Sequence, residues 1–278
     1  MVHALRTHWP EYLMEAAGLG LFMGSAGLCG TLFEYAQSPV HRAIADPFAR
    51  RTLMGVAMGL TAVGIIYSPW GKQSGAHINP ATSLTFWRLG KVAGWDAGFY
   101  AAAQFVGGLA GVLLVAAIIG DWFLSPPVAA VATVPGASGG AAAFVAEVAM
   151  TFLLMLMVLF VSNSASIARY TGLVVGLLVA VYITLEAPVS GMSMNPARTF
   201  ASALAGNTWT ALWVYFTAPL LGMLAAAQVY LALRGRGAVR CAKMHHGSDK
   251  RCIFCGFPGL EVAAGRIVND SRTFRTGA

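Results

Sequence analysis

Two copies of a short motif, Asn-Pro-Ala, stand within apolar stretches of the sequence as Asn79-Pro80-Ala81 and Asn195-Pro196-Ala197. Pro lacks a backbone N–H and pushes the preceding residue out of the helical region, so the motif is poor sequence for a helix interior. It suits a helix start, because the Asn side chain caps free N–H groups and Pro fits the first turn. Each motif is followed by about ten mostly apolar residues, too few to cross a bilayer. The pair predicts two half-helices buried in protein or lining a water-filled cavity within a membrane.

A second group of residues that could do chemistry lies near the C-terminus, where three thiols and two imidazoles fall within fifteen residues: Cys241, His245, His246, Cys252 and Cys255. The last two cysteines have Cys-x₂-Cys spacing, and tetrahedral Zn²⁺ takes mixed sulfur and nitrogen ligands. In a helix, residues four apart share one face, as Cys241 and His245 then would. The sequence predicts one Zn²⁺ bound by Cys241, His245, Cys252 and Cys255, with His246 as the second choice of imidazole. A free-thiol tail and a disordered basic tail stay open as alternatives.

The composition indicates the elements that position these residues. Hydrophobic residues make up 57% of the 278 residues and charged residues 10%, whereas a soluble domain has about 25% charged residues. Six runs carry few or no charges, and each is near the roughly 17–25 residues of a spanning helix: residues 12–33, 52–69, 97–119, 141–161, 170–185 and 208–233. The predicted fold is an all-α integral membrane protein with six transmembrane helices and two re-entrant half-helices. The first run is too long for a cleaved signal peptide.

The chain repeats itself, because residues 13–17 (LMEAA) resemble residues 145–149 (VAEVA). Each copy places a glutamate, Glu15 or Glu147, in a span that precedes its own Asn-Pro-Ala motif. Three spans per half is an odd number, so the halves must be inverted relative to each other, and such repeats place their site at the membrane midplane. We expect a channel domain at 1–233, with repeats at about 11–119 and 141–233, and a basic tail at 234–278. The linker 121–140 is expected to be an ordered external loop.

The positive charges indicate the orientation of the chain. With six spans, fourteen of the eighteen Lys and Arg residues fall on the side of the two termini. Basic residues favour the cytoplasmic side of a membrane, so both termini are predicted to be cytoplasmic in a multi-pass protein of the cell membrane. The net charge of +7 is therefore explained by basic residues that set the orientation of the chain in the membrane, and no nucleic-acid partner is expected.

These features resemble the aquaporins, or major intrinsic proteins, over roughly residues 11–233. The features that carry the resemblance are the paired motifs, the continuation of the second into Arg198, the Ser-Gly-Ala-His lead-in at 74–77 and the glutamates of spans one and four. The resemblance implies a homotetramer of separate pores in a lipid bilayer, with half-helices that meet head to head and no cofactor in the pore. It implies that Glu15 and Glu147 accept backbone N–H groups of the half-loops, and that His77 is a packed, hydrogen-bonded residue.

The implied arrangement predicts a passive channel for water. Each helix N-terminus carries about half a positive charge, so a cation or proton meets a barrier where two of them face each other. Asn79 and Asn195 would each donate a hydrogen bond to a passing water and so interrupt a proton-conducting chain. Thr199, Ala203 and the aromatic pair Tyr215 and Phe216 resemble water channels more than glycerol channels. Glycerol or another small neutral solute remains the alternative.

The resemblance also implies a selectivity filter formed by Arg198, Met192, Ile183 and a residue of the second span. Met58 is expected there, with Gly59 as the alternative. Water-selective members usually have a small residue and a His at the Met192 and Ile183 positions, and glycerol channels an aromatic and a small residue. The predicted filter is therefore more apolar than either type, and adaptable because Met is unbranched and flexible.

Two other classes of function would require different residues in the spans. A cation-coupled transporter would need a cation site at the midplane, and the partial positive charges of two helix N-termini there argue against one. An intramembrane enzyme would need a catalytic motif, and the spans contain neither His-Glu-x-x-His nor Gly-x-Ser-x-Gly, so no enzymatic activity is expected. A metal- or redox-sensing membrane protein that acts through its Cys and His tail remains the alternative from another class.

Overall fold

The computed structural model describes residues 1–259, and these form helices joined by turns, without strands. Six helices are long and apolar enough to cross a membrane. They are α1 (Val2–Glu34), α3 (Pro47–Tyr67), α6 (Gly94–Ile119), α8 (Gly139–Ser162), α9 (Thr171–Ser190) and α11 (Leu212–Arg234). The half-helices are α5 (Pro80–Arg88) and α10 (Pro196–Ala205), each starting at the Pro of its Asn-Pro-Ala motif. The predicted fold of six apolar helices and two half-helices is confirmed.

Short elements connect the long helices. They are α2 (Pro39–Ala43), α4 (Pro69–Ser74), α7 (Asp121–Leu124) and the 3₁₀ turns η1 (Ala129–Val131), η2 (Ala168–Tyr170) and η3 (Arg236–Ala238). Pro begins several elements because it fits a first helical turn. In α3, Pro47 follows Asp46, whose carboxylate accepts the N–H groups of Phe48 and Ala49.

The first helix is longer than its apolar run predicts. It begins at Val2, whereas the run begins at residue 12. The additional turns are polar, and they stay helical because tertiary contacts hold them: His8 Nδ1 lies 2.8 Å from Asp96 Oδ1, at the start of α6. Hydropathy alone cannot detect such an extension, because it counts only apolar residues.

The helices pack in matching pairs in the two halves. In the first half α1 packs along α6, in the second α8 packs along α11, and α3 packs along α9 between the halves. Glycines allow close approach at equivalent places. A Cβ on Gly107 of α6 would lie 2.0 Å from the Ala16 carbonyl oxygen, and one on Gly222 of α11 would lie 2.2 Å from the Thr151 hydroxyl. Small residues at helix contacts are how membrane helices bring their backbones together.

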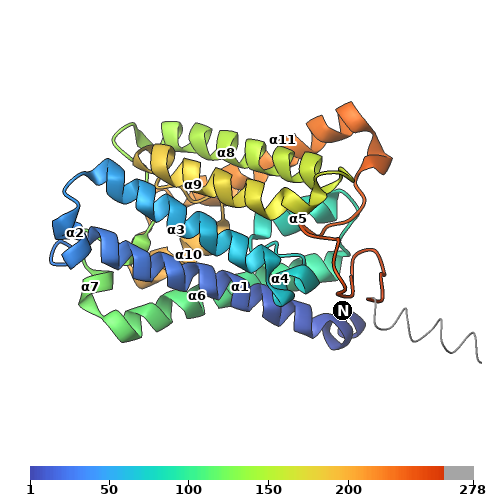
Figure 1. Ribbon diagram of the computed structural model, residues 1–278, viewed down its shortest axis with the longest axis horizontal. Coiled ribbons are helices and arrows are strands. Elements are labelled where there is room, and N and C mark those ends of the chain that lie inside the picture. Colours follow the sequence, from blue (N-terminus) through green and yellow to red (C-terminus); the bar gives the residue numbers. More distant parts are fainter. Residues whose placement is uncertain (260–278) are drawn as a thin grey trace, which may run out of the picture.

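The two ends of the bundle differ. Residues 1–8, α4 and residues 234–259 gather at one end, called the tail end below (Figure 1). Figure 1 also shows α5 nearer the tail end and α10 nearer the opposite end. All seven tryptophans are exposed near the helix ends: Trp9, Trp70, Trp87 and Trp95 toward the tail end, and Trp122, Trp209 and Trp213 toward the opposite end. Such aromatic belts mark the two surfaces of a bilayer.

Candidate functional site

The two motif asparagines are the N-cap residues of the half-helices. Asn79 Oδ1 accepts a hydrogen bond from the Ala81 N–H at 2.9 Å. Asn195 Oδ1 accepts from the N–H groups of Ala197 at 3.1 Å and Arg198 at 3.3 Å. Both asparagines therefore do the capping that their sequence context predicts.

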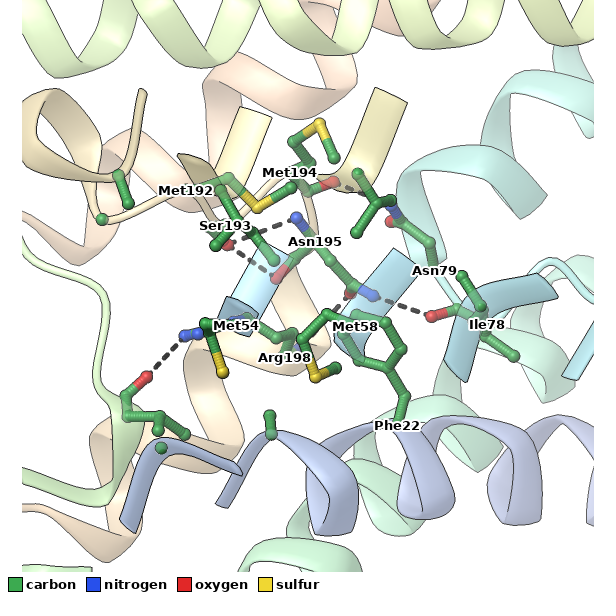
Figure 2. Close-up of a pocket in the computed structure, with 18 of the residues that line it drawn as sticks. Phe22, Met54, Met58, Ile78, Asn79, Met192, Ser193, Met194, Asn195 and Arg198 are labelled. Atoms are coloured by element: carbon green, nitrogen blue, oxygen red, sulfur yellow. Dashed lines mark hydrogen bonds between the residues drawn. The ribbon is translucent and has the colours of Figure 1, made fainter. Parts of the chain in front are cut away.

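The same two asparagines connect the halves of the protein. Asn79 Nδ2 donates to the Met194 carbonyl at 2.7 Å, and Asn195 Nδ2 donates to the Ile78 carbonyl at 2.7 Å (Figure 2). An amide NH₂ has two donor hydrogens, so each Asn keeps one beyond this crossed pair. Both residues line the same cavity, which leaves their remaining donors available to a molecule inside it.

The turns that precede the half-helices have an unusual backbone. Ala76 and Ile78 in the first turn, and Met192 and Met194 in the second, have φ between 40° and 56°. This left-handed conformation costs an L-residue about 1–2 kcal/mol. Two strained positions in each turn must therefore be stabilised by the surrounding structure.

Glu15 stabilises the first turn from the middle of α1. One carboxylate oxygen accepts the Ser74 hydroxyl at 2.8 Å and the His77 N–H at 3.0 Å. The other accepts the Ile78 N–H at 2.6 Å and the Gln104 side-chain amide at 2.8 Å. Glu15 is fully buried, and four donors compensate for the cost of removing its carboxylate from water.

Glu147 does the same for the second turn from α8. Its Oε1 accepts the Ser190 hydroxyl and the Ser193 N–H, both at 2.7 Å, and its Oε2 accepts the Met194 N–H at 2.7 Å. Tyr215 donates its hydroxyl to the Ser190 carbonyl at 2.6 Å. The sequence pattern associated Tyr215 with water channels, and in the structure it holds this turn.

His77 is buried and bonded at both ring nitrogens. Its Nε2 donates to the Ala242 carbonyl at 2.8 Å, so its Nδ1 accepts from the Ser83 hydroxyl at 3.0 Å. The ring stacks on Phe86 and Phe254, with centroid distances of 5.2 and 5.4 Å. His77 is therefore a packed histidine, as expected, but two of its partners, Ala242 and Phe254, belong to the C-terminal tail.

A central cavity of about 480 Å³ passes between the half-loops. Toward the opposite end its walls include Glu34, Pro47 and Arg51, and toward the tail end they include Ile66 and Met244. Figure 2 shows the middle of this cavity, where Asn79 and Asn195 lie next to each other. Its position at the meeting point of two half-helices is the one that the inverted repeat predicts.

All four residues predicted for the selectivity filter line this cavity: Met58, Ile183, Met192 and Arg198. Arg198 Nη1 donates to the Val131 carbonyl at 2.8 Å, which holds the guanidinium against the cavity wall. These four residues thus bring one cation and three apolar side chains to the cavity wall.

Close contacts between α3 and α9 fix how the two helices are aligned. A Cβ on Gly55 would lie 2.5 Å from the Ala180 carbonyl oxygen and 2.7 Å from the Thr184 hydroxyl. A Cβ on Gly59 would lie 2.5 Å from the Gly176 carbonyl oxygen. The contact point moves from Gly55 to Gly59 on α3 while it moves from Ala180 to Gly176 on α9. The two helices therefore run antiparallel.

This alignment adds a second candidate, Met54, beside the filter residue Met58 predicted in the second span. Met54 lies level with Ile183, whereas Met58 lies four residues deeper, a distance of about 6 Å along a helix. Both methionines line the cavity, with Met58 the nearer to Asn195 (Figure 2). Gly59, the alternative, packs against α9. The lining residues Met54, Met58, Ala62 and Ile66 recur at every fourth position, a helical stripe that could have identified Met54 from the sequence.

A cluster of possible metal ligands lies in the tail. One side-chain atom from each of Cys241, His246, Cys252 and Cys255 lies within 4.8 Å of the others. The Cys241 and Cys252 sulfurs are 3.4 Å apart, and His246 Nε2 is 3.1 Å from the Cys255 sulfur.

The structure corrects the imidazole of this cluster from His245 to His246. The prediction of His245 assumed helical spacing from Cys241, but residues 239–246 are not helical. The ring of His245 instead packs edge-on against Tyr67, at a centroid distance of 5.2 Å. The other three predicted ligands are brought together.

Two thiols of the cluster differ in acidity. The hydrogen bond from Cys241 lowers the pKa of the Cys252 thiol, and the same bond raises the pKa of Cys241. The deprotonated form is therefore favoured at Cys252. A thiolate is the form of cysteine that binds metals.

Comparison with known proteins agrees with this geometry. The family model "Major intrinsic protein" matches residues 4–230. Aquaporin NIP2-3 of Zea mays is 36% identical over 189 residues, which cover 68% of this chain and 60% of that protein. The probable aquaporin AqpM of Archaeoglobus fulgidus is 37% identical over 184 residues, 64% of this chain and 74% of that protein. The matched region thus spans about 60% of the length of the maize relative.

The fold has a solved counterpart. The aquaglyceroporin from Plasmodium falciparum superposes with a TM-score of 0.68 at 23% identity, covering 81% of this chain and 96% of that one. At this identity the likeness concerns the fold. Together with the match over residues 4–230, the paired half-helices and the buried glutamates, it leads to one conclusion: the chain belongs to the major intrinsic protein family of membrane channels.

Proposed function

We propose that the protein is a passive channel for water that excludes ions and protons. The observation that carries this proposal is the pair of half-helix N-termini, capped by Asn79 and Asn195, that meet in the central cavity. Their combined partial charges, about half a unit each, repel a cation at that point. The free N–H of each Asn orients a passing water so that it cannot relay a proton to the next one.

We further propose a multi-pass protein of the cell membrane with the tail end in the cytoplasm. The topology predicted from the sequence supports this orientation, because it assigns to that side fourteen of the eighteen basic residues, three of which lie outside the described residues. The resemblance supports a homotetramer with one pore in each subunit, and the pore itself uses no cofactor.

A small neutral solute such as glycerol is the second candidate substrate. The observation in its favour is the wall of the filter, where Met54, Ile183 and Met192 face the cavity with Arg198 as the polar group. Apolar side chains accept the carbon skeleton of a polyol, while the guanidinium donates hydrogen bonds to its hydroxyls.

Proteoliposomes that contain the full chain should shrink faster than empty liposomes under an osmotic gradient, with a low activation energy and no ionic current. Stopped-flow light scattering gives the rate, and the comparison should use both metal-loaded and chelator-treated protein. Folded protein whose water permeability equals that of empty liposomes in both states would contradict the proposed channel. A parallel glycerol gradient distinguishes the two candidate substrates.

The filter proposal predicts that Met192→Ala and Met54→Ala widen the constriction. Each should raise glycerol flux relative to water flux, on the order of tenfold, the effect of changing a few methylenes in an apolar site. Met58→Ala also truncates a methionine, but one helical turn deeper in the cavity. It should therefore change the ratio of glycerol flux to water flux less than Met54→Ala does. Met157→Ala, on the exposed surface of α8, is the control. If Met58→Ala changes the ratio more than Met54→Ala, Met58 is the filter residue.

A further inference from the structure

The C-terminal tail lies across the tail end of the central cavity and is fixed on both sides of it. On one side the Arg240 N–H donates to Asn163 Oδ1 at 2.7 Å, at the end of α8. On the other, Arg251 forms a two-pronged ion pair with Glu11 of α1, with contacts of 2.8 and 2.7 Å. Glu11 is fully buried, whereas the Arg251 side chain is 38% exposed, so the ion pair lies at the surface of the bundle. Figure 1 shows the tail passing from the end of α11 to the start of α1.

Between these anchors the tail bonds to the turn that carries the first Asn-Pro-Ala motif. The Met244 N–H donates to the Gly75 carbonyl at 3.2 Å, and the Ala242 carbonyl accepts from His77 at 2.8 Å. Phe254 stacks on His77 with an interplanar angle of 5°. The tail therefore touches the half-loop of the channel itself as well as its outer surface.

Met244 is the residue that enters the cavity. Within the part of the tail that the structure describes, it is the residue that lines the cavity wall, and its side chain is only 7% exposed. It belongs to the same buried apolar cluster as Met58, Ile66 and Val175. An apolar side chain offers a passing water no hydrogen bond, and apolar constrictions close channels by excluding water.

The tail has little else to fix its shape. Residues 239–259 contain neither helix nor strand, and so short a segment cannot build a hydrophobic core of its own. Lys243, although buried, donates to carbonyls of the tail itself, those of Arg251 at 2.6 Å and Lys250 at 3.4 Å. A structural metal is one means by which such short segments gain a fixed conformation.

The cysteine and histidine cluster has the geometry of such a site. Four ligands at tetrahedral Zn²⁺, with Zn–S bonds of about 2.3 Å, lie roughly 3.8 Å from one another. The ligand atoms here lie within 4.8 Å of one another, and the Cys241 and Cys252 sulfurs are 3.4 Å apart. Cys241 and His246 flank Met244 in the sequence, while Cys252 and Cys255 flank Phe254 in the segment that returns.

We propose that one Zn²⁺, bound by Cys241, His246, Cys252 and Cys255, holds Met244 in the mouth of the cavity, so that the metal-loaded channel is closed and metal removal opens it. The proposal rests on the proposed channel function. On this proposal the tail controls the channel in response to metal. It is then not the sensor of a separate metal- or redox-sensing function.

The test measures zinc and water permeability on the same full-length protein. Protein purified under reducing conditions without chelator should contain about one zinc per chain. Chelation should raise its water permeability in proteoliposomes several-fold, and added Zn²⁺ should restore the low value. The double variant Cys252→Ser, Cys255→Ser should contain no zinc and stay permeable. Cys29→Ser, which changes a thiol inside α1, is the matched control and should behave as the unmodified chain.

A second variant separates closure from metal binding. Met244→Ala should keep its zinc and yet be permeable, because only the side chain in the mouth is removed. Less than a tenth of a zinc per chain in the unmodified protein, or a disulfide between Cys241 and Cys252 in its place, would overturn the metal site. Equal permeability of the unmodified protein, the chelated protein and Met244→Ala would overturn the closure and leave the channel standing. Absence of permeability in all of them would instead overturn the channel function, whatever the zinc content.

Discussion

Replacing Glu147 with Leu will prevent the protein from keeping a stable fold. The Ser193 and Met194 N–H groups and the Ser190 hydroxyl all donate to this carboxylate. In the variant the Ser190 hydroxyl still has Glu186 as an acceptor at 2.9 Å, whereas the two N–H groups lose theirs. Each buried donor left without an acceptor costs about 1–3 kcal/mol, so the two together cost about 2–6 kcal/mol. The strained turn at 192–194 loses its support at the same time. Thermal melting and gel filtration in detergent should show a large loss of folded, monodisperse protein.

Glu186→Gln is the matched control for this change. Its carboxylate lies 2.9 Å from the same Ser190 hydroxyl, but it is not the group that accepts from Ser193 and Met194. We expect this variant to remain monodisperse, with a melting temperature close to that of the unmodified chain. A Glu147→Leu protein that melts at the same temperature as Glu186→Gln would show that the carboxylate does not hold the half-loop.

Arg198→Ala should widen the filter and lower its electrostatic barrier to cations. A unit charge a few ångströms from a passing cation costs that cation about 4 kcal/mol at 4 Å in a medium of intermediate dielectric. Removing it should increase proton leakage, on the order of tenfold for each 1.4 kcal/mol of barrier lost, and raise glycerol flux. The half-helix N-termini remain, so exclusion is weakened without being abolished. A pH-sensitive dye trapped in chelator-treated proteoliposomes measures the leak.

Arg198→Lys separates the charge from the geometry of the guanidinium. It keeps a cation in the filter but loses the rigid fork that reaches the Val131 carbonyl. We expect it to remain proton-tight while its ratio of glycerol to water flux changes. If proteoliposomes with Arg198→Ala leak protons no faster than those with the unmodified chain, the barrier to protons lies at Asn79 and Asn195 alone.

Most of the fold and the centre of the pore could be predicted from the sequence, because their signals are local. Apolar runs gave the six spans, and the capping chemistry of Asn79 and Asn195 gave the half-helices. Glu15 and Glu147 were identifiable as ionisable groups inside apolar spans. The polar start of α1 was missed, since residues 2–11 are held by contacts with distant residues such as Asp96.

The features that the sequence does not reveal depend on contacts between distant segments. The candidate Met54 is one of them, because the level of a residue along the cavity depends on how α3 packs against α9, and counting back from one motif does not show this packing. His246 was underrated because the tail was assumed to be helical. The described part of the tail bends back on itself instead, and it is fixed by contacts with Gly75 and Glu11, more than 160 residues away in the sequence.

The crossed hydrogen bonds of the two asparagines have a consequence for how the protein is made. Asn79 pairs with a carbonyl 115 residues later, and Asn195 with one 117 residues earlier. While the ribosome has produced only the first three spans, the first half-loop lacks its partner, so this region must wait for the second half to be inserted. The ion pair between Arg251 and Glu11 joins residues 240 apart. The tail therefore docks only on a chain whose pore has already been synthesised, and a newly inserted subunit passes through a stage in which its mouth is uncovered.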